Sequence, residues 1–317
     1  MIAGCGYVGK RVANRWLQGG DTVFALTRSI SRAAELEEQG IQPIVWDWLV
    51  GGPPDDAKRW RGFVDLVRDA RMSSLLVAVS HAPQPGVPHD ETHVCGLKNL
   101  SEILKSGGLL DSERDRLRWI YLSTTGVFGN GGDGQWLDET TPENPERPGS
   151  IAAWCAEQWL MANSLPGQFV VLRPSGIYGP DRVPRWESIR DRVPLQVDPQ
   201  SFLNLIHVDD LSRIIESVSN RTMTSTLYCV SDCEPVRRQA YYEFISKLGG
   251  WPDAVFERPV VEANRPNPSR SDGNKRVRNQ RILNELSFAF QFPSYREGLV
   301  SLLSNCDIPP KITDRRH

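Results

Sequence analysis

Three closely spaced glycines near the start of the chain, Gly4, Gly6 and Gly9, point more directly to a chemistry than any other residues. They form a Gly-x-Gly-x-x-Gly motif between an apolar stub, Met1 to Ala3, and a helix-like stretch, Val8 to Leu17. In that order of strand, loop and helix, the first glycine allows a tight turn, the second lets a pyrophosphate approach, and the third packs helix on strand. The motif therefore predicts a dinucleotide site.

The free N–H groups at the start of the following helix would face the phosphates, and we expect Tyr7 and Val8 in this contact set. The motif also matches most of a nucleotide-triphosphate P-loop, because it continues Gly9-Lys10 at the right spacing. That loop needs Ser or Thr at the next position to bind magnesium, and the residue here is Arg11. We therefore favour the dinucleotide interpretation.

The residues after the second apolar run indicate which dinucleotide is bound. That run ends with Arg28 and Ser29, Arg32 follows a turn later, and no Asp or Glu occupies the terminus. An acidic residue there binds the ribose 2′-hydroxyl of NAD, whereas an arginine accommodates the 2′-phosphate of NADP. Because Arg28 can grip a phosphate with forked donors, the sequence predicts NADP in preference to NAD. Asp47 ends the third apolar run, either at the adenine edge of the site or as a turn cap.

Three later segments place hydroxyl side chains, tyrosines and a histidine around the ends of apolar runs. They are Tyr121-Leu-Ser-Thr-Thr-Gly-Val-Phe-Gly129, Leu172-Arg-Pro-Ser-Gly-Ile-Tyr-Gly-Pro-Asp-Arg182 and Asn204-Leu-Ile-His-Val-Asp-Asp-Leu211. With the glycine motif, in this order and spacing, they resemble the extended short-chain dehydrogenase/reductase family, the NAD-dependent sugar-nucleotide epimerases and dehydratases. The resemblance runs over nearly the whole chain, and the segments Ser231–Pro235 and Lys275–Val277 look most like an atypical branch of that family.

The resemblance implies roles for several of these side chains. Thr124 matches the Ser or Thr that helps hold the substrate oxygen in the family, and Ser123 and Thr125 flank it. By the same resemblance we expect Ser123 and Pro174 at the cofactor, and Thr125, Ser175 and Tyr178 in the substrate pocket.

The family's usual acid/base pair, a Tyr-x-x-x-Lys on the next helix, is missing from its expected place. In that pair the lysine's positive charge lowers the pKa of the tyrosine phenol, which allows proton exchange with the substrate. The segment Ala156–Gln158 matches the Glu-Gln usually found beyond the lysine, so counting back places Ala153 at the lysine and Gly149 at the tyrosine. Neither side chain can move a proton, so the resemblance carries over the fold and the cofactor site but not the usual relay.

Three explanations for this departure stay open. Another residue supplies the acid, the reaction needs no protein acid of that kind, or the protein binds NADP without turnover. The candidate acids are His81, Arg147, Tyr178 and His207. His81 is the best placed of them, because it follows the fourth apolar run, at the carboxyl end of the expected sheet, where ligands bind.

Short apolar runs alternate with amphipathic stretches over the first half of the chain, and this pattern predicts the scaffold that positions these residues. The strand-like runs are Thr22–Leu26, Ile41–Trp46, Leu75–Val79, Leu117–Leu122 and Phe169–Leu172. The helix-like stretches between them are Ser31–Gln39, Asp56–Asp69, His89–Leu104 and Ile151–Asn163. The pattern predicts an α/β fold, a doubly wound parallel sheet of the Rossmann type with a smaller C-terminal substrate-binding part.

The alternation breaks after Arg173, and we expect two parts. Residues 1–175 form the NADP-binding part with residues 204–230 packing back on it, and residues 176–203 and 231–317 form the smaller part. Residues 179–203 are predicted to be irregular, and residues 262–275, which are polar and contain prolines, to be an exposed loop or lid. Helices are expected at Val208–Val218, Val236–Leu248 and Gln280–Glu285.

Composition narrows the class of protein and its partners. The 317 residues carry a formal net charge of −2, which favours neither a nucleic acid nor a membrane as partner. The six cysteines are scattered without zinc-site spacing, which is typical of reduced structural thiols in a cytoplasmic protein, and we expect no metal. Because Met1 to Ala3 is short for a central strand, either the true start lies upstream or strand one is unusually short.

These observations predict an NAD(P)-binding oxidoreductase or epimerase-like enzyme acting on a small polar substrate, by resemblance a nucleotide sugar. The alternative is a non-catalytic NADP-binding regulator, which the missing pair at Gly149 and Ala153 favours. Members of the family often form dimers through helices of the cofactor part, so the resemblance also implies a homodimer.

Overall fold

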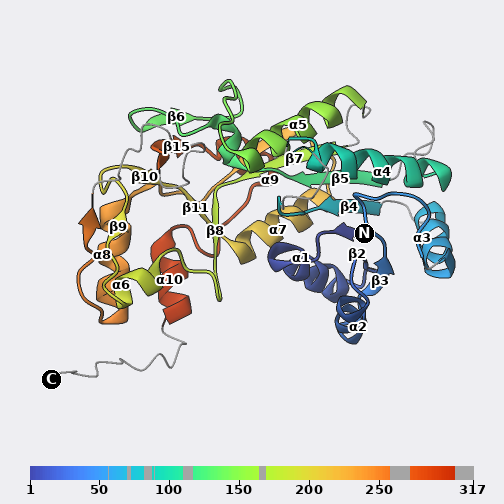
Figure 1. The fold of residues 1–317 in the computed structure, drawn as a ribbon, viewed down its shortest axis with the longest axis horizontal. Coiled ribbons are helices and arrows are strands. Elements are labelled where there is room, and N and C mark those ends of the chain that lie inside the picture. The colour runs from blue at the N-terminus through green and yellow to red at the C-terminus, as the bar shows by residue number, and fades with distance from the viewer. Residues whose placement is uncertain are drawn as a thin grey trace.

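The computed structural model describes residues 1–55, 57–69, 73–81, 88, 90–109, 117–163, 169–257 and 272–303. A seven-stranded sheet lies at the centre of this part of the chain (Figure 1). Its strands are β1 (Ile2–Ala3), β2 (Phe24–Thr27), β3 (Gln42–Val45), β4 (Ser73–Val77), β5 (Leu117–Leu122), β7 (Phe169–Pro174) and β12 (Leu227–Val230). They follow the order β12-β7-β5-β4-β1-β2-β3, and every neighbouring pair is parallel. The predicted doubly wound sheet is confirmed.

The strand order reverses beside β1, and this is the place where such a sheet binds ligands. From β1 the chain fills one side of the sheet with β2 and β3, and then crosses to β4 on the other side. In sheets with such a reversal the two connections diverge, and ligands bind at the carboxyl ends of the strands beside it. Both the glycine loop and His81 follow strands that end at this point.

Alternation along each strand sends successive side chains to opposite faces of the sheet and creates two apolar layers. Ile2 and Leu76 belong to one buried cluster, and Ala3 and Leu75 belong to the other. The helices that cover the Ala3 face are α3 (Ala57–Asp69), α4 (Thr92–Ser106) and α5 (Pro148–Asn163), and those on the Ile2 face are α1 (Tyr7–Gln18), α2 (Ile30–Glu38), α7 (Val208–Ser219) and α9 (Gln280–Leu286). Figure 1 shows α4 and α5 above the sheet and α1 and α7 below it.

The central strand β1 has two residues, but its pairing continues to Met1. The carbonyl of Met1 accepts a hydrogen bond of 2.9 Å from the Leu76 N–H. The terminal amine of Met1 donates one of 2.7 Å to the carbonyl of Ser74. Both bonds hold the strand in register next to β4, and thereby fix where the glycine loop begins.

A third apolar cluster lies in the C-terminal part of the chain, away from the sheet. Its helices are α6 (Trp186–Arg190), α8 (Arg238–Gly249) and α10 (Tyr295–Leu303). Four short strand pairs join distant segments: β8 (Gly176–Tyr178) with β11 (Leu205–His207), β9 (Leu195–Gln196) with β14 (Phe256–Glu257), β10 (Phe202–Leu203) with β13 (Val236–Arg237), and β6 (Gln135–Leu137) with β15 (Lys275–Val277). Figure 1 shows α6, α8 and α10 gathered at the opposite end of the molecule from α2 and α3.

Two predictions about this part of the chain need correction. Residues 179–203 are not simply irregular, because they contain α6, β9 and β10, which are too short to show a periodic pattern. Most of the predicted exposed loop 262–275 lies outside the described residues, but its last residue, Lys275, is 8% exposed in β15. Backbone carbonyls accept hydrogen bonds from its ammonium group, which allows a lysine to be buried there.

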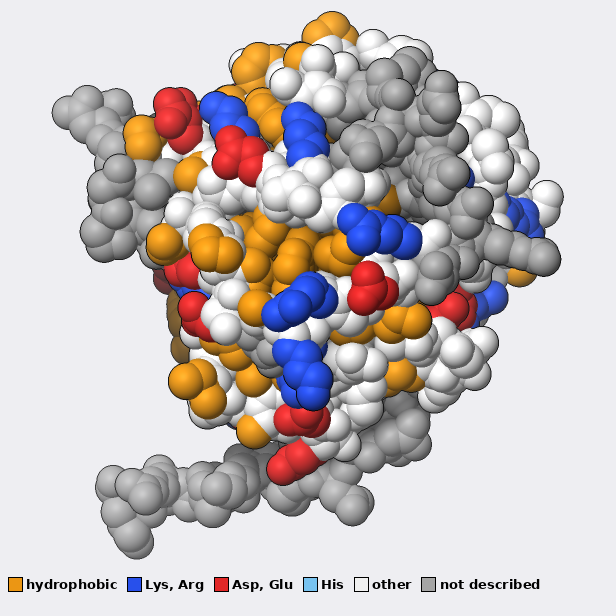
Figure 2. Space-filling model, turned by 90° about the vertical axis from the view of Figure 1, so that its right-hand side faces the viewer, with side chains coloured by type: hydrophobic (Ala, Val, Ile, Leu, Met, Phe, Trp, Pro, Cys, Tyr) orange, Lys and Arg blue, Asp and Glu red, His pale blue; other side chains and the backbone are white. Residues whose placement is uncertain are grey.

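The face of the molecule on which α3 lies carries no dominant charge. Figure 2 views the side of the molecule on which α3 lies, and it shows apolar side chains interspersed with basic and acidic ones. This mixture agrees with the formal net charge of −2. Within the described residues, no helix combines the length and apolar character needed to cross a membrane.

Candidate cofactor site and active site

The three glycines of the loop between β1 and α1 have three different surroundings. Gly4 has a φ of +93°, and a Cβ there would lie 2.6 Å from the backbone carbonyl of Ala78. A Cβ at Gly9 would overlap the carbonyl oxygen of Gly4. A Cβ at Gly6 would meet nothing within 4 Å, and Gly6 gives α1 no side-chain cap. Gly4 and Gly9 thus permit tight packing, while Gly6 leaves open space before a helix N-terminus, which can hold a pyrophosphate.

Two arginines follow β2, Arg28 directly after the strand and Arg32 in the first turn of α2. Arg32 donates a hydrogen bond of 3.1 Å to the carbonyl of Cys5, inside the loop, and pairs with Glu35. The Arg28 side chain is 55% exposed, and its nearest acidic partner is Asp47, at 3.9 Å. Arg32 therefore contacts the glycine loop, and Arg28 lies near Asp47 with its guanidinium accessible.

The hydroxyl and carboxylate next to these arginines have structural partners of their own. Ser29 caps α2, because its side chain accepts a hydrogen bond of 3.3 Å from the Arg32 N–H. Asp47 accepts one of 3.0 Å from the Leu49 N–H, as in the turn-cap interpretation of this residue. One acceptor position of the Ser29 hydroxyl is therefore already used by the helix N–H.

Thr124 lies directly after β5, at the carboxyl edge of the sheet. It caps the short 3-10 helix η1 (Thr125–Phe128) by accepting a hydrogen bond of 3.0 Å from the Gly126 N–H. Its hydroxyl hydrogen stays available to a ligand. Its neighbour Ser123 is buried and donates to Glu157, and the Thr125 carbonyl accepts 2.8 Å from the Lys275 ammonium. Pro174 and Ser175, also buried, follow at the end of β7.

His81 comes from the carboxyl end of β4 and packs against the N-terminal turn of α5. A Cβ at Gly149 would lie 3.3 Å from the His81 Cβ and 3.5 Å from its ring Cδ2. The imidazole therefore occupies space that a large side chain at position 149 would need. Ala153, one turn further along α5, is 3% exposed in an apolar cluster with Val127 and Val277.

A second histidine lies behind His81. The rings of His81 and His93 are 5.9 Å apart between centroids, and His93 Nδ1 lies 2.7 Å from the Tyr121 hydroxyl. Burial, together with the nearby His81, lowers the pKa of His93 to about 4, so it is neutral at pH 7. Burial keeps the pKa of Tyr121 well above its usual range, so this hydroxyl retains its proton. The sequence analysis did not identify this pair, because α4 and β5 meet only in the folded chain.

Three polar groups converge on Gly126 in η1. From the point where a Gly126 side chain would begin, Ser150 Oγ lies at 2.5 Å, Arg147 Nη2 at 2.8 Å and Thr124 Oγ1 at 3.2 Å. Lys275 approaches the same turn through Thr125 and Gly129 carbonyls, and burial, with Arg147 nearby, lowers its pKa to about 8. Neither Ser150 nor Lys275 was predicted as a site residue. Lys275 lies 150 positions from Thr125 along the chain, so no local pattern connects the two.

A buried ion pair ties the next two elements together. Arg173 in β7 and Glu157 in α5 are both 0% exposed and lie 2.6 Å apart. Glu157 also accepts from Ser123, and Arg173 pairs with Glu143 at 2.5 Å. The pair fixes α5 against the ends of β5 and β7, and so helps to position Ser123.

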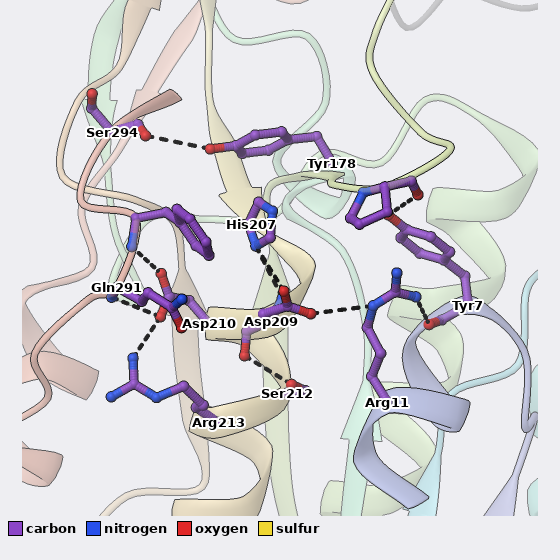
Figure 3. Close-up of polar contacts among 12 residues, drawn as sticks. Tyr7, Arg11, Tyr178, His207, Asp209, Asp210, Ser212, Arg213, Gln291 and Ser294 are labelled. Carbon is purple, nitrogen blue, oxygen red and sulfur yellow. Dashed lines mark hydrogen bonds and ion pairs between the residues drawn. The ribbon is translucent and has the colours of Figure 1, made fainter. Parts of the chain in front are cut away.

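The other two candidate acids, Tyr178 and His207, lie in a joint between the sheet and the C-terminal part (Figure 3). Tyr178 is 0% exposed and donates 3.3 Å to the Ser294 carbonyl. His207 Nδ1 accepts 3.2 Å from the Asp209 N–H, and burial lowers its pKa. Arg11 binds Asp209 at 3.2 Å. These residues hold the elements together, and burial separates Tyr178 and His207 from solvent.

Tyr7 extends this joint to the glycine loop. Its hydroxyl donates 2.9 Å to the Pro180 carbonyl, and the Arg11 guanidinium lies 4.3 Å from the centre of its ring. Figure 3 shows Arg11 reaching from α1 to Asp209, while its guanidinium also donates to the backbone carbonyl of Tyr7. Tyr7 therefore links the start of α1 to the segment after β8, while buried Val8 packs into the core.

Comparisons with known proteins support this architecture. The chain matches the family described as "NAD dependent epimerase/dehydratase family" over residues 1–197. It is 29% identical over 229 residues, 71% of this chain and 74% of the relative, to Protein YeeZ of Escherichia coli (strain K12).

Solved structures show the same fold over almost the whole chain. A conserved protein of unknown function from Silicibacter pomeroyi DSS is 26% identical, with a TM-score of 0.71 and coverage of 96% of this chain and 97% of that one. The UDP-glucose 4-epimerase of Thermus thermophilus, solved in complex with NAD, is 17% identical, with a TM-score of 0.69 and coverage of 96% and 97%. The sheet order, the glycine loop and the family match together show that this chain belongs to the NAD-dependent epimerase/dehydratase family.

Proposed function

We propose that the protein is an NADP-dependent oxidoreductase or epimerase-like enzyme. The observation that carries this proposal is the contrast among the three glycines: Gly4 and Gly9 are closely packed, whereas Gly6 faces open space before the α1 N-terminus. Such a loop at the reversal of the strand order suits the pyrophosphate of a dinucleotide. A nicotinamide cofactor bound there supplies or accepts a hydride.

Arg28 supports NADP over NAD. Its guanidinium is more than half exposed directly after β2, and a 2′-phosphate can accept its forked hydrogen bonds. Asp47, at 3.9 Å, is too far for a hydrogen bond with Arg28, so a phosphate can replace it as the nearer anion. Arg32, bound to the loop carbonyl of Cys5, adds a second positive charge.

Thr124 and His81 are the side chains that we propose to handle the substrate. The Thr124 hydroxyl binds the reacting oxygen, and His81 exchanges its proton. In the oxidation direction a C–H bond breaks with its electron pair, which leaves as hydride, while the O–H proton passes to His81 and a C=O bond forms. His81 suits this role because its ring borders Gly149, the position that matches the family's tyrosine. We do not assign Tyr178 to substrate contact, because its side chain is fully buried.

A non-catalytic NADP-binding regulator is the second candidate. Gly149 and Ala153 favour it, because neither can take part in the proton exchange that the family's tyrosine and lysine perform. Under this hypothesis the glycine loop and Arg28 still bind NADP, and His81 packs against α5 without exchanging a proton.

Calorimetric titration with NADP and NAD tests the shared part of both candidates, and we expect NADP to bind more tightly. A screen of carbonyl compounds and nucleotide sugars for a change in NADPH absorbance then separates enzyme from regulator. Turnover that His81→Gln abolishes, with NADP affinity unchanged, supports the enzyme. Binding without turnover across a broad panel supports the regulator, and failure to bind either dinucleotide contradicts both.

A further inference from the structure

The groups that converge on Gly126 form a set of donors with positive charge. Arg147 and Ser150 come from the start of α5, Thr124 comes from the end of β5, and all three lie within 3.2 Å of one point. Gly126 permits this convergence, since a Cβ there would overlap the Ser150 hydroxyl and the Arg147 guanidinium. The Gly126 backbone has no positive φ, so the turn itself does not require glycine.

The donors in this cluster can serve a ligand. Thr124 already accepts the Gly126 N–H, so its hydroxyl is left to donate. Ser150 is 4% exposed, and its hydroxyl carries one hydrogen that it can donate. Arg147 is half-buried and contributes guanidinium N–H donors. A hydroxyl and a guanidinium that face one turn can donate to the oxygens of a carboxylate, and the Thr124 hydroxyl beside them can donate to a further substrate oxygen.

The surrounding charges favour the same kind of ligand. Lys275 reaches η1 from β15, and the Arg147 charge contributes to the lowering of its pKa, as expected where two cations share a site. The positive end of the α5 dipole lies at the same place, because Arg147 directly precedes this 16-residue helix. Glu146 offsets part of this charge, since it acts on the Lys275 pKa in the opposite direction.

The cluster adjoins the proposed proton-exchanging group. Ser150 follows Gly149, against which His81 packs, and Thr124 is the residue proposed to bind the reacting oxygen. An anion bound by Arg147 and Ser150 would therefore lie next to the reacting carbon. We infer that Arg147 and Ser150 recognise a substrate carboxylate adjacent to the carbon that exchanges hydride, as in a 2-hydroxy or 2-oxo acid, while Thr124 holds the reacting oxygen. This inference rests on the proposed function.

Oxalate, a small planar dicarboxylate, tests the inference in calorimetric titrations of the NADP-saturated protein. We expect oxalate to bind, and Arg147→Gln to weaken its binding by about tenfold to a hundredfold, because a charge-assisted contact is lost. Arg147→Lys should keep part of the affinity, since it retains the charge without the fork. Gly126→Ala should also weaken oxalate binding, because the new methyl group displaces Arg147 and Ser150.

Arg61→Gln is the matched control, because this exposed arginine on α3 undergoes the same change of charge far along the sheet. It should bind oxalate as the wild type does, and every variant should bind NADP with unchanged affinity. The inference is overturned if oxalate does not bind, or if Arg147→Gln binds oxalate as tightly as the wild type does. The proposed function stays intact in both cases as long as the wild type binds NADP. Inorganic phosphate that binds through Arg147 where oxalate does not also overturns the carboxylate assignment. Loss of NADP binding in the wild type would instead contradict the proposed function.

Discussion

Substitution by alanine should affect different properties at Gly4 and Gly6, two positions apart in one loop. At Gly4 it should lower the stability of the fold, and at Gly6 it should lower the affinity for the cofactor. An alanine Cβ at Gly4 would lie 2.6 Å from the Ala78 carbonyl, a backbone group that cannot rotate away, and would force a φ of +93° on a residue with a side chain. An alanine Cβ at Gly6 meets nothing within 4 Å, so the unliganded protein accommodates it. The cofactor does not, because the added methyl group occupies the space proposed for its pyrophosphate.

The magnitudes follow from these surroundings. Overpacking at Gly4→Ala costs about 1–3 kcal/mol and the left-handed backbone about 1–2 kcal/mol, so we expect a loss of about 3 kcal/mol. For a large domain this lowers Tm by about 6–12 °C. Gly6→Ala should cost at most about 1 kcal/mol, as for other exchanges at a helix N-cap. The methyl group of Gly6→Ala should also remove one charge-assisted hydrogen bond to the phosphate. Such a bond contributes about 1.5–3 kcal/mol, so NADP binding should weaken by about 10- to 150-fold.

Thermal unfolding without cofactor and calorimetric titration with NADP measure the two effects separately. Gly132→Ala is the matched control, because a Cβ there also meets nothing within 4 Å and lies far from the loop. It should change neither stability nor NADP affinity. Wild-type NADP affinity in Gly6→Ala, or wild-type Tm in Gly4→Ala, would refute the reasoning for the respective glycine.

Three further predictions concern single side chains. Arg28→Ala should weaken NADP binding by at least about tenfold and leave NAD binding nearly unchanged, because it removes the proposed 2′-phosphate contact; equal losses for both in calorimetry would argue against this role. His93 has a pKa of about 4 in the fold against 6.5 in the unfolded chain, so only the unfolded state takes up its proton between these values. The wild type should therefore lose about 3 kcal/mol of stability relative to His93→Gln as the pH falls from 6.5 to 4, with no difference from this group above 6.5; parallel pH profiles in urea unfolding would contradict the burial argument. Glu157→Gln should destabilise the protein by about 3–5 kcal/mol, since it leaves the fully buried Arg173 charge without its main partner; a urea midpoint equal to that of the wild type would show that Glu143 alone is sufficient.

Most of the sheet could be predicted from sequence, because buried parallel strands form continuous apolar runs. The prediction Leu117–Leu122 coincides with β5, and the helix predicted at Val208–Val218 differs from α7 by one residue. The seventh strand, β12, was not identified separately, since its four residues resemble any short buried segment. The elements α6, β9 and β10 were also missed. The helix α6 has five residues, fewer than two helical turns, and β9 and β10 have two residues each, too few to show an alternating pattern.

The candidate site could be predicted where its residues are close in sequence. The glycine loop and Arg28 belong to one strand-loop-helix-strand unit, so a local pattern describes them. His93, Ser150 and Lys275 belong to elements that meet only through the sheet topology, and no local pattern connects them with Thr124 or His81. The burial of Lys275 could not be predicted from the composition of its segment, because a lysine in a polar segment normally indicates exposure.

A crystal structure of the protein with NADP would test the central claim most directly. The account predicts the pyrophosphate against Gly6 at the N-terminus of α1 and the 2′-phosphate on Arg28. An NADP molecule bound elsewhere, or a crystal soaked with NADP in which the glycine loop holds no dinucleotide, would contradict it.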